Sequence, residues 1–464
     1  MSDTLHNEEP QGGNKRDGIE KNASIRFPRA EIRAELHIFA LLKHKHLKHK
    51  DTMKNTFIIA TLSALLLPLT GAAQTVWTVN VANGSDNAKT AAPVVIDLRG
   101  CGIDVKSATV TLNGNEMPCQ IDDIDGDGTA DELCFLADVA GKSSETFNVE
   151  LFDSGTPRLY EPQVYVEMLL SKKKVKVSNK QDLYITSLKV DHDVNPYWML
   201  HHHGAAFENE MVAYRIYFDH RQTVDIYGKY HKGLELRQTQ FYPDDAQKAE
   251  GYGDDVLWVG STFGVGALRG WDGTQPTMVQ NVQHRSQRIV ARGPLRTIVE
   301  VTDEGWVPQE GQEPIDMKAL YTLYAGNRDC HIDIAFNKNV SDYRFSTGII
   351  NVKNSTEYSD NDGLRACWGT DWPVSAKDSA GHKRETVGLA IYVPKANIVS
   401  EEVANKDNYA YVVKASADNT LSYRVTFTSD NETFGYHSDT DWYNYLKAWK
   451  KDVDQPVTVT VTKQ

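Results

Sequence analysis

Short β-forming runs separated by turn residues fill most of the chain after residue 75, and this alternation constrains the fold more than any other feature of the sequence. In the first part, such runs cover residues 94–98, 108–112, 132–136 and 145–149. Asn113-Gly114 follows the second run, and this dipeptide is typical of a two-residue hairpin turn. We therefore expect a small N-terminal β-sandwich at 74–155, followed by a linker that contains glycine and proline.

The rest of the chain, residues 160–464, keeps the same pattern and contains few amphipathic helices. β-Forming runs cover residues 164–170, 211–219, 223–229, 296–301, 321–324, 331–336, 388–393 and 457–461. The exception is 439–450, where Trp442, Tyr445, Leu446 and Trp449 recur at helical spacing and predict a core-facing stripe. The sequence therefore predicts an all-β protein, with the small sandwich followed by a large two-sheet β-sandwich and few helices.

A secretory signal peptide is predicted at residues 53–73. Met53-Lys54-Asn55 forms a short basic start, residues 57–69 are almost wholly apolar, and Gly71-Ala72-Ala73 offers small residues before a cleavage point. The apolar run is too short for a permanent membrane span. We expect residues 1–52 to be an over-extended gene start. The mature protein would then begin near Gln74 and be periplasmic or secreted, without a membrane span.

Charge and missing motifs exclude several classes of function. The formal net charge is −13, and an acidic protein repels nucleic acid. The sequence has no phosphate-binding glycine loop, no G-x-S-x-G, no H-E-x-x-H and no paired C-x-x-C. Five cysteines are too few for a disulfide scaffold, and their odd number leaves at least one free. We expect no nucleic-acid partner and no organic cofactor.

An acidic loop at 123–131 has the spacing of a calcium-binding loop. Oxygen-bearing side chains alternate along it at Asp123, Asp125, Asp127, Thr129 and Asp131, with Gly128 at the sixth position for the sharp turn. The twelfth position holds Cys134 instead of glutamate, and the flanking runs are strands, so the loop is not an EF-hand. The pattern predicts a structural Ca²⁺ site, and the alternative is an acidic hairpin without metal.

Three adjacent histidines, His201, His202 and His203, lie in a predicted loop after Asn195-Pro196. Histidine acts as a general base or metal ligand near neutral pH. Adjacent side chains cannot all point the same way, so at most two of the three serve one site. The alternative is a polar loop with solvated histidines.

The runs 211–219 and 223–229 predict a hairpin with one apolar and one polar face. Side chains alternate between the two faces of each strand. The polar side chains of both strands therefore share one face if the connection has an odd number of residues. A three-residue loop would set Tyr217 opposite Asp225 and Arg215 opposite Tyr227. The residues expected on this face are Arg215, Tyr217, Asp225, Tyr227 and Lys229. The alternative is the solvated side of an antiparallel sheet.

Several of these stretches together resemble the secreted bacterial family catalogued as domain of unknown function 4861. They are residues 122–135, 201–210, 214–229, 251–273 and 321–333, and the resemblance covers nearly the whole mature chain. It implies a role in polysaccharide degradation. It also implies an enzyme that dehydrates uronic-acid-ended oligosaccharides from ulvan, a sulfated algal polysaccharide. The fold expected for the large domain is a mutarotase-like supersandwich.

Such a dehydration yields a 4,5-unsaturated terminal sugar and makes three chemical demands. The sugar carboxylate must be neutralised before the C5 proton leaves, and we assign this role to Arg215. A base removes that proton, and an acid protonates the departing hydroxyl. His202 or His203 is the expected base, and Tyr227 or Lys229 the expected acid. The partner is then an anionic oligosaccharide substrate. Two alternatives remain, a non-catalytic glycan-binding protein and a mutarotase-type sugar isomerase.

Overall fold

The computed structural model describes residues 75–171 and 183–463. The predicted signal peptide and gene start, residues 1–73, lie outside this part of the chain. None of the helices within the described ranges has the length and apolarity that a bilayer crossing requires. The five cysteines are free thiols, and four of them are buried.

The N-terminal part is a small β-sandwich, as expected. One sheet consists of β29 (Thr458–Lys463), β1 (Thr75–Asn83), β7 (Ser143–Phe152), β3 (Ser107–Leu112) and β4 (Asn115–Met117), in that order. The other consists of β2 (Lys89–Asp97), β6 (Glu132–Val139) and β5 (Cys119–Asp122). Alternate side chains of both sheets, among them Trp77, Phe135 and Phe147, form one core. The predicted hairpin turn joins β3 to β4, with positive φ at both Asn113 and Gly114.

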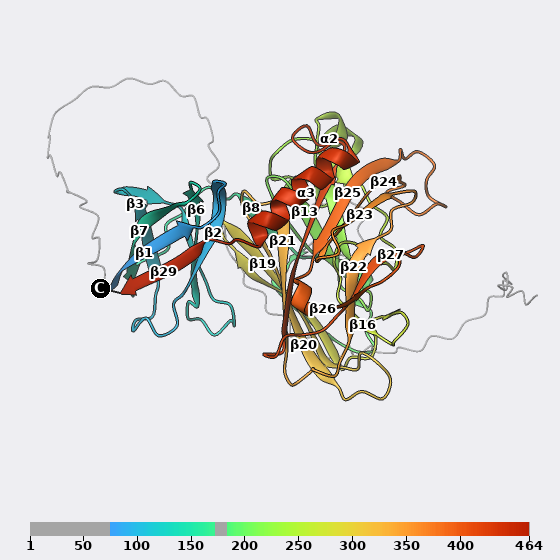
Figure 1. The fold of residues 1–464 in the computed structure, drawn as a ribbon, viewed down its shortest axis with the longest axis horizontal. Coiled ribbons are helices and arrows are strands. Elements are labelled where there is room, and N and C mark those ends of the chain that lie inside the picture. Colours follow the sequence, from blue (N-terminus) through green and yellow to red (C-terminus); the bar gives the residue numbers. More distant parts are fainter. Residues whose placement is uncertain (1–74, 172–182, 464) are drawn as a thin grey trace, which may run out of the picture.

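The last strand of the chain belongs to this N-terminal sandwich. β29 pairs antiparallel with β1, from Trp77 opposite Lys463 to Ala82 opposite Thr458. Figure 1 shows β29 in red beside the blue β1, so two strands from opposite ends of the sequence lie side by side. The expected large domain at 160–464 therefore does not keep its C-terminal strand, because β1 offers an open sheet edge that this strand completes.

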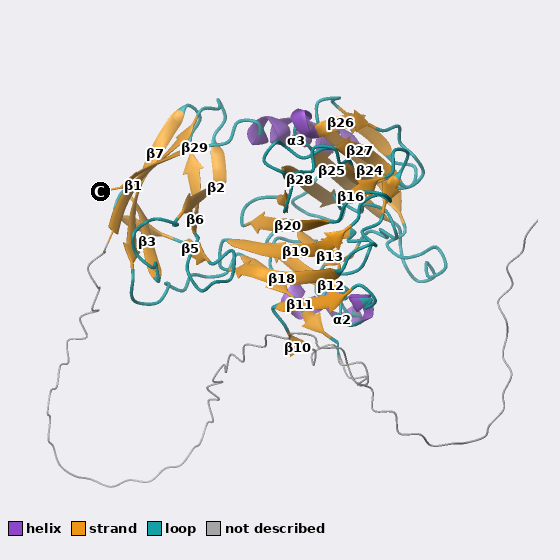
Figure 2. Ribbon diagram, turned by 90° about the horizontal axis from the view of Figure 1, so that it is seen from below, coloured by secondary structure: helices purple, strands orange, loops and turns teal. Residues whose placement is uncertain are grey.

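The large domain has one layer formed by a nine-stranded antiparallel sheet. Its order is β11 (Ser187–Asp191), β18 (His284–Arg292), β19 (Arg296–Trp306), β20 (Ile315–Tyr324), β21 (Asp329–Phe336), β28 (Thr420–Ser429), β25 (Glu385–Tyr392), β24 (Leu364–Asp371) and β23 (Thr356–Ser359). Figure 2 shows this layer from below, with the N-terminal sandwich beside it.

Two five-stranded sheets form the facing layer. The first is β15 (Asp254–Asp255), β14 (Val224–Gly228), β13 (Ala213–Tyr217), β12 (Gly204–Asn209) and β8 (Val164–Glu167). The second is β17 (Pro276–Thr277), β16 (Arg269–Trp271), β22 (Phe345–Ile350), β27 (Asn408–Val413) and β26 (Ile398–Glu401). A small pair, β9 (Leu169–Leu170) and β10 (Leu183–Tyr184), lies apart from both.

Single bridges at 264–265 link the two five-stranded sheets into one layer. Val224 pairs with Gly264, and Val265 pairs with Ile349. Gly264 has φ +59°, and a Cβ there would lie 1.9 Å from the carbonyl oxygen of Val224, so only glycine fits. One continuous hydrophobic core fills the space between this layer and the nine-stranded sheet. The predicted all-β, two-layer large sandwich is confirmed.

Helices are few and mostly short. They are η1 (Pro196–Trp198), α1 (Leu236–Thr239), α2 (Asp245–Ala249), η2 (Lys395–Asn397) and α3 (Asp439–Val453). Ser438 caps the N-terminus of α3, and its Trp442, Leu446 and Trp449 are buried against the nine-stranded sheet. The predicted core-facing stripe of this helix is thus confirmed.

Buried ionic contacts join the two domains. Arg296, at the start of β19, contacts Asp122 and Glu132 of the N-terminal sandwich at 2.7 Å each. The side chain of Gln120 bonds to the backbone of Leu295 and Arg296. A cavity of about 650 Å³ lies along the seam, lined by Lys89, His331, Arg424 and Trp449 among others.

Candidate functional site

The hairpin that carries the expected site residues is β13–β14. Alternation holds, because Tyr214, Ile216 and Ile226 face the core, whereas Arg215 bonds to Tyr217 and Asp225 on the other face. The last pair is Ile216 opposite Val224, so an odd number of residues, 217–223, separates the paired positions, in agreement with the prediction. The register differs by two residues: Arg215 lies opposite Asp225 and Tyr227 opposite Ala213, so the predicted pairs are wrong.

The polar face of this hairpin is buried, not solvated. Leu236 and Phe241, from the segment between β14 and β15, pack over Ala206, Ala213 and Tyr227. Burial forces every polar group on this face to find a partner. Two groups of contacts result, one structural in character and one that reaches the surface.

Lys229 lies in the structural group. Its Nζ donates to Glu208 Oε2 at 2.6 Å and to the carbonyl oxygens of Asn209 and Gly233 at 2.7 and 2.5 Å. Lys229 and Glu208 are both completely buried. The Glu208 carboxylate also accepts the backbone N–H groups of Glu235 and Leu236, so this pair anchors the start of α1 over the sheet. All three Nζ donors are therefore engaged.

Tyr227 and His202 have similarly closed surroundings. The hydroxyl of Tyr227 donates to Glu235 at 2.9 Å, and Glu235 also accepts the N–H of Gly253. His202 is wholly buried, with Nδ1 2.8 Å from the carbonyl of Gly204 and Nε2 3.1 Å from Glu167. Both of its ring nitrogens face oxygen acceptors.

Arg215 is the centre of the second group. Its Nη2 lies 2.6 Å from Asp225 and 2.9 Å from Asp255, and its Nη1 donates to the hydroxyl of Tyr242 at 2.6 Å. The hydroxyl of Tyr217 lies 3.3 Å from Nη2 and donates to Asp225 at 2.9 Å. One guanidinium thus holds two carboxylates and two phenols.

Asp255 connects this group to the surface. Its side chain is 20% exposed, whereas that of Asp225 is fully buried. Burial raises the pKa of Asp255 well above its usual range, and the nearby charge of Asp225 raises it further. Asp255 also lines a cavity of about 200 Å³. The other residues that line it include Tyr230, Tyr252, Lys248, His382 and Lys383.

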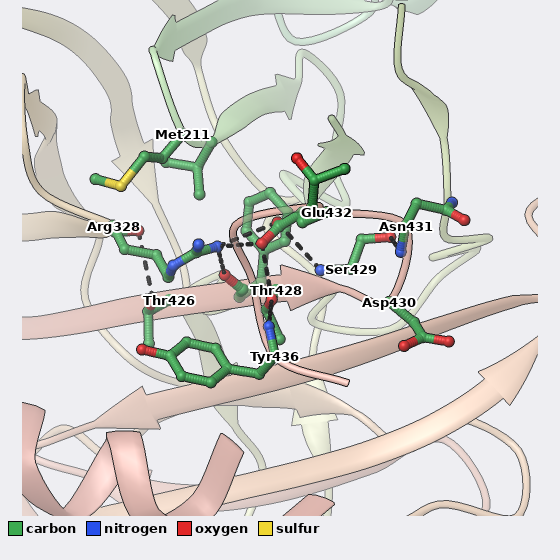
Figure 3. Close-up of polar contacts among 12 residues, drawn as sticks. Met211, Arg328, Thr426, Thr428, Ser429, Asp430, Asn431, Glu432 and Tyr436 are labelled. Atoms are coloured by element: carbon green, nitrogen blue, oxygen red, sulfur yellow. Dashed lines mark hydrogen bonds and ion pairs between the residues drawn. The ribbon is translucent and has the colours of Figure 1, made fainter. Parts of the chain in front are cut away.

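A rigid loop supports one wall of this cavity. The backbone oxygen of Tyr230 accepts both the N–H and the hydroxyl of Thr433 at 2.9 Å. Nearby in that loop, Glu432 is held by Arg328 at 2.8 Å and accepts from Thr428 and the N–H of Ser429 (Figure 3). The buried ion pair therefore fixes the loop that positions Tyr230.

His203 immediately precedes β12 and lies beside the β13–β14 connection, where its carbonyl oxygen accepts the N–H of Phe218 at 2.7 Å. Its Nδ1 is 3.0 Å from the carbonyl oxygen of Tyr197, so this nitrogen carries the proton, and within the described residues Nε2 has no hydrogen-bond partner. Its ring lies 6.0 Å from that of Tyr217, whose hydroxyl contacts Arg215. Partial burial lowers the pKa of His203 to about 4, so the imidazole is neutral at neutral pH.

Aromatic side chains surround His203 at the surface. Tyr197 stacks on it and Trp198 meets it edge-on at 5.2 Å. Arg221 lies over the Tyr197 ring at 4.6 Å and donates to the carbonyl of Gly260, close to Trp258. Trp198 and Trp258 are 65% and 50% exposed, which is unusual for tryptophan in a folded domain. These exposed rings beside polar groups make this surface a candidate for ligand binding.

Of the five predicted site residues, Arg215 and His203 come together through Tyr217, whereas His202, Tyr227 and Lys229 occupy closed buried contacts. Sequence reasoning missed Asp255, Tyr242 and the two exposed tryptophans. The glycine-rich stretch 251–255 has no phosphate-loop spacing. Its tandem carboxylates after glycines were the available signal for Asp255.

Three of the five expected calcium ligands cluster in the acidic loop between β5 and β6. Carboxylate oxygens of Asp123, Asp125 and Asp131 lie within 4.8 Å of one another. Asp127 is outside this group of carboxylates and instead accepts the N–H of Thr129 at 2.7 Å, so a ligand role for Thr129 stays a prediction. The clustered donors are hard oxygens of the kind that Ca²⁺ prefers, so calcium binding stays a prediction.

The fold and this site define a two-domain β-sandwich protein with a buried Arg–Asp network that opens at the surface. The chain belongs to the family described as domain of unknown function (DUF4861), whose model matches residues 81–459. No curated protein matches the sequence.

Solved structures that are similar to this chain include two from one species. They are a protein in the glycosyl hydrolase family 38 from Enterococcus faecalis and an α-mannosidase from Enterococcus faecalis V583. Their sequence identities are 10% and 11%, and their TM-scores are 0.45 and 0.43. Each match covers 83% of this chain but 47% and 46% of the other, so the chain spans about half the length of these proteins.

Proposed function

We propose that this protein is a carbohydrate-active lyase that removes water from the terminal uronic acid of an anionic oligosaccharide, such as one from ulvan. The product is a 4,5-unsaturated terminal sugar. The observation that carries the proposal is the connection of His203, through Tyr217, to the Arg215–Asp225–Asp255 group. Family resemblance to polysaccharide-degradation proteins and the predicted export support it.

His203 is the base in this proposal. Its Nδ1–H is held by the carbonyl of Tyr197, so the lone pair of Nε2 is available to take the C5 proton. The lowered pKa keeps the ring in its neutral, proton-accepting form. In this proposal exposed Trp198, which contacts the His203 ring, and exposed Trp258 stack on sugar faces.

Arg215 acts by positioning in this proposal. Its donors are engaged by Asp225, Asp255 and the two phenols, so its charge is already compensated. In this proposal the substrate carboxylate contacts the ammonium groups of Lys248 and Lys383 in the neighbouring cavity, which also pair with Asp254 and Glu385.

Asp225 and Asp255 do not form the pair of surface carboxyl groups of a glycosidase, although Asp254 and Glu385 line the same cavity as Asp255. A glycosidase needs two carboxyl groups that flank the scissile bond. Asp225 is fully buried and its Oδ2 already accepts from Arg215 and Tyr217, so only Asp255 of this pair reaches the surface. The alternatives that remain are a non-catalytic glycan-binding protein and a mutarotase-type sugar isomerase.

A panel of uronic-acid oligosaccharides tests the proposal. Absorbance of the conjugated alkene should rise with time, and mass spectrometry should show the loss of one water without shortening of the chain. Chain shortening with an alkene would indicate a polysaccharide lyase, and shortening with added water a hydrolase. Binding with unchanged mass would favour the glycan-binding alternative, and anomer exchange at unchanged mass the isomerase.

A further inference from the structure

Two carboxylates share one cation at the centre of the site. Asp225 on β14 and Asp255 on β15 both accept from Nη2 of Arg215, at 2.6 and 2.9 Å. A single guanidinium compensates one negative charge, so two ionised carboxylates here would leave an uncompensated charge in a mostly buried place. One of the two is therefore expected to carry a proton.

The hydrogen bonds differ between the two carboxylates. Oδ2 of Asp225 accepts from Nε and Nη2 of Arg215 and from the Tyr217 hydroxyl, and its Oδ1 accepts the N–H of Ile226. Asp255 accepts from Nη2 and, at 3.4 Å, from the N–H of Leu257. Four donors stabilise the anion of Asp225, so Asp255 is the better place for the proton.

Solvent exposure also favours Asp255 over Asp225 as the place for the proton. Asp255 is partly exposed and lines the 200 Å³ cavity, whereas Asp225 is closed off. The titratable and charged groups that face Asp255 come from β13, β14, the 242–254 segment and the 382–385 loop. Together with the adjoining Tyr230, they are Arg215, Tyr217, Asp225, Tyr242, Lys248, Tyr252, Asp254, His382, Lys383 and Glu385.

We propose that Asp255 is the catalytic proton donor of the site and that the adjacent cavity receives the carboxylate-bearing part of a single uronic acid unit. This inference rests on the proposed dehydration. It replaces Tyr227 and Lys229 in the donor role, because the hydroxyl of Tyr227 is bonded to Glu235 and Lys229 has no free N–H.

The step balances with the residues present. The base takes the C5 proton, and the electron pair of the C5–H bond forms the C4=C5 double bond. The C4–O bond breaks, its electrons go to oxygen, and the proton of Asp255 completes the departing water. Asp255 is left as a carboxylate, which the Arg215 guanidinium stabilises, and the base is left protonated. Return of that proton to Asp255 through solvent restores the starting state.

Asp255→Asn tests this role, since an amide oxygen still accepts from Arg215 but has no acidic proton. Turnover should fall by about 10²–10⁴-fold, the usual contribution of one general acid. In the wild type, activity should be lost as the pH rises through the raised pKa of Asp255. Asp225→Asn removes the like charge that raises this pKa, so it should move that alkaline limb to lower pH. Asp191→Asn, a surface carboxylate paired with His284, is the matched control and should change neither.

Infrared spectroscopy separates this inference from the proposed function. A difference spectrum of wild type minus Asp255→Asn at pH 7 should contain the C=O band of a protonated carboxylic acid, and this readout needs no substrate. A carboxylate band instead, or full turnover by Asp255→Asn, would overturn the assignment of Asp255. Absence of dehydration by the wild type, with the protonated band present, would reject the proposed reaction while leaving the protonation of Asp255 established.

Discussion

The imidazole of His203 lies flat against the phenol ring of Tyr197, with the ring centroids 3.8 Å apart and the planes 3° from parallel. The same tyrosine fixes the tautomer, because its carbonyl oxygen lies 3.0 Å from Nδ1. One residue thus orients the ring and leaves Nε2 toward the surface. This contact leads to the first prediction.

His203→Ala is expected to lower turnover on uronic-acid oligosaccharides by about 10²–10⁴-fold while the protein stays folded. Because the pKa of His203 is about 4, the base is neutral above that pH, and the acidic limb of the activity profile should lie at about pH 4. A pH profile of kcat/KM checks this. An acidic limb near 6.5, or normal turnover by His203→Ala, would remove His203 from the mechanism. The surface variant His284→Ala serves as control.

Loss of the exposed tryptophans should lower the affinity for sugar more than it lowers kcat. Trp198→Ala and Trp258→Ala should each raise KM or Kd by about tenfold, equivalent to about 1.4 kcal/mol, with kcat little changed. Calorimetry and steady-state kinetics measure the two quantities. Leu159→Ala, a 96% exposed side chain in the linker, is the control for general surface effects. Unchanged affinity in both tryptophan variants would place the sugar elsewhere.

Lys229→Met should destabilise the protein without a specific catalytic effect. Removing one partner of the buried Lys229–Glu208 pair leaves an unpaired carboxylate and typically costs about 3–5 kcal/mol. Lys189→Met breaks a surface pair with Glu304 and should cost less than about 1 kcal/mol. Denaturant unfolding compares the two variants. If Lys229→Met were inactive at wild-type stability, the lysine would regain its place as a candidate acid.

Calcium binding at the acidic loop should appear as added thermal stability. A ligand at 100 times its Kd stabilises the native state by about 2.7 kcal/mol. Asp131→Asn removes one of the three clustered carboxylates and should abolish the effect, whereas Asp127→Asn, outside the cluster, should only reduce it. Melting curves with and without chelator measure this. Identical curves for the wild type under both conditions would mean that the loop holds no calcium.

Local sequence was sufficient for the strands and their faces. On β13, apolar and polar residues alternate with a period of two, and this periodicity is a property of the extended backbone itself. It therefore predicted that Arg215, Tyr217, Asp225 and Tyr227 share a face. The amphipathic stripe on α3 was readable for the same reason, because helical spacing is local.

Register, burial and partners depended on the rest of the molecule. Ile216 pairs with Val224, so the register differs from the expected one by two residues while the shared face is unchanged. Lys229 looked like a solvated lysine because nothing near it in sequence reveals that α1 covers it. The sequence therefore suggested Lys229 as a candidate acid, although hydrogen bonds engage all three of its Nζ protons.

The sequence by itself determined that this is a β-sandwich protein with a histidine loop next to a polar hairpin, because strand alternation and turn residues act over a few neighbouring positions. Only the tertiary structure decided which of those polar groups can meet a substrate. Asp255 joins Arg215 from 40 residues away, and β29 returns to β1 from the other end of the chain. Such contacts are selected by the burial and pairing of distant segments, which no local pattern encodes.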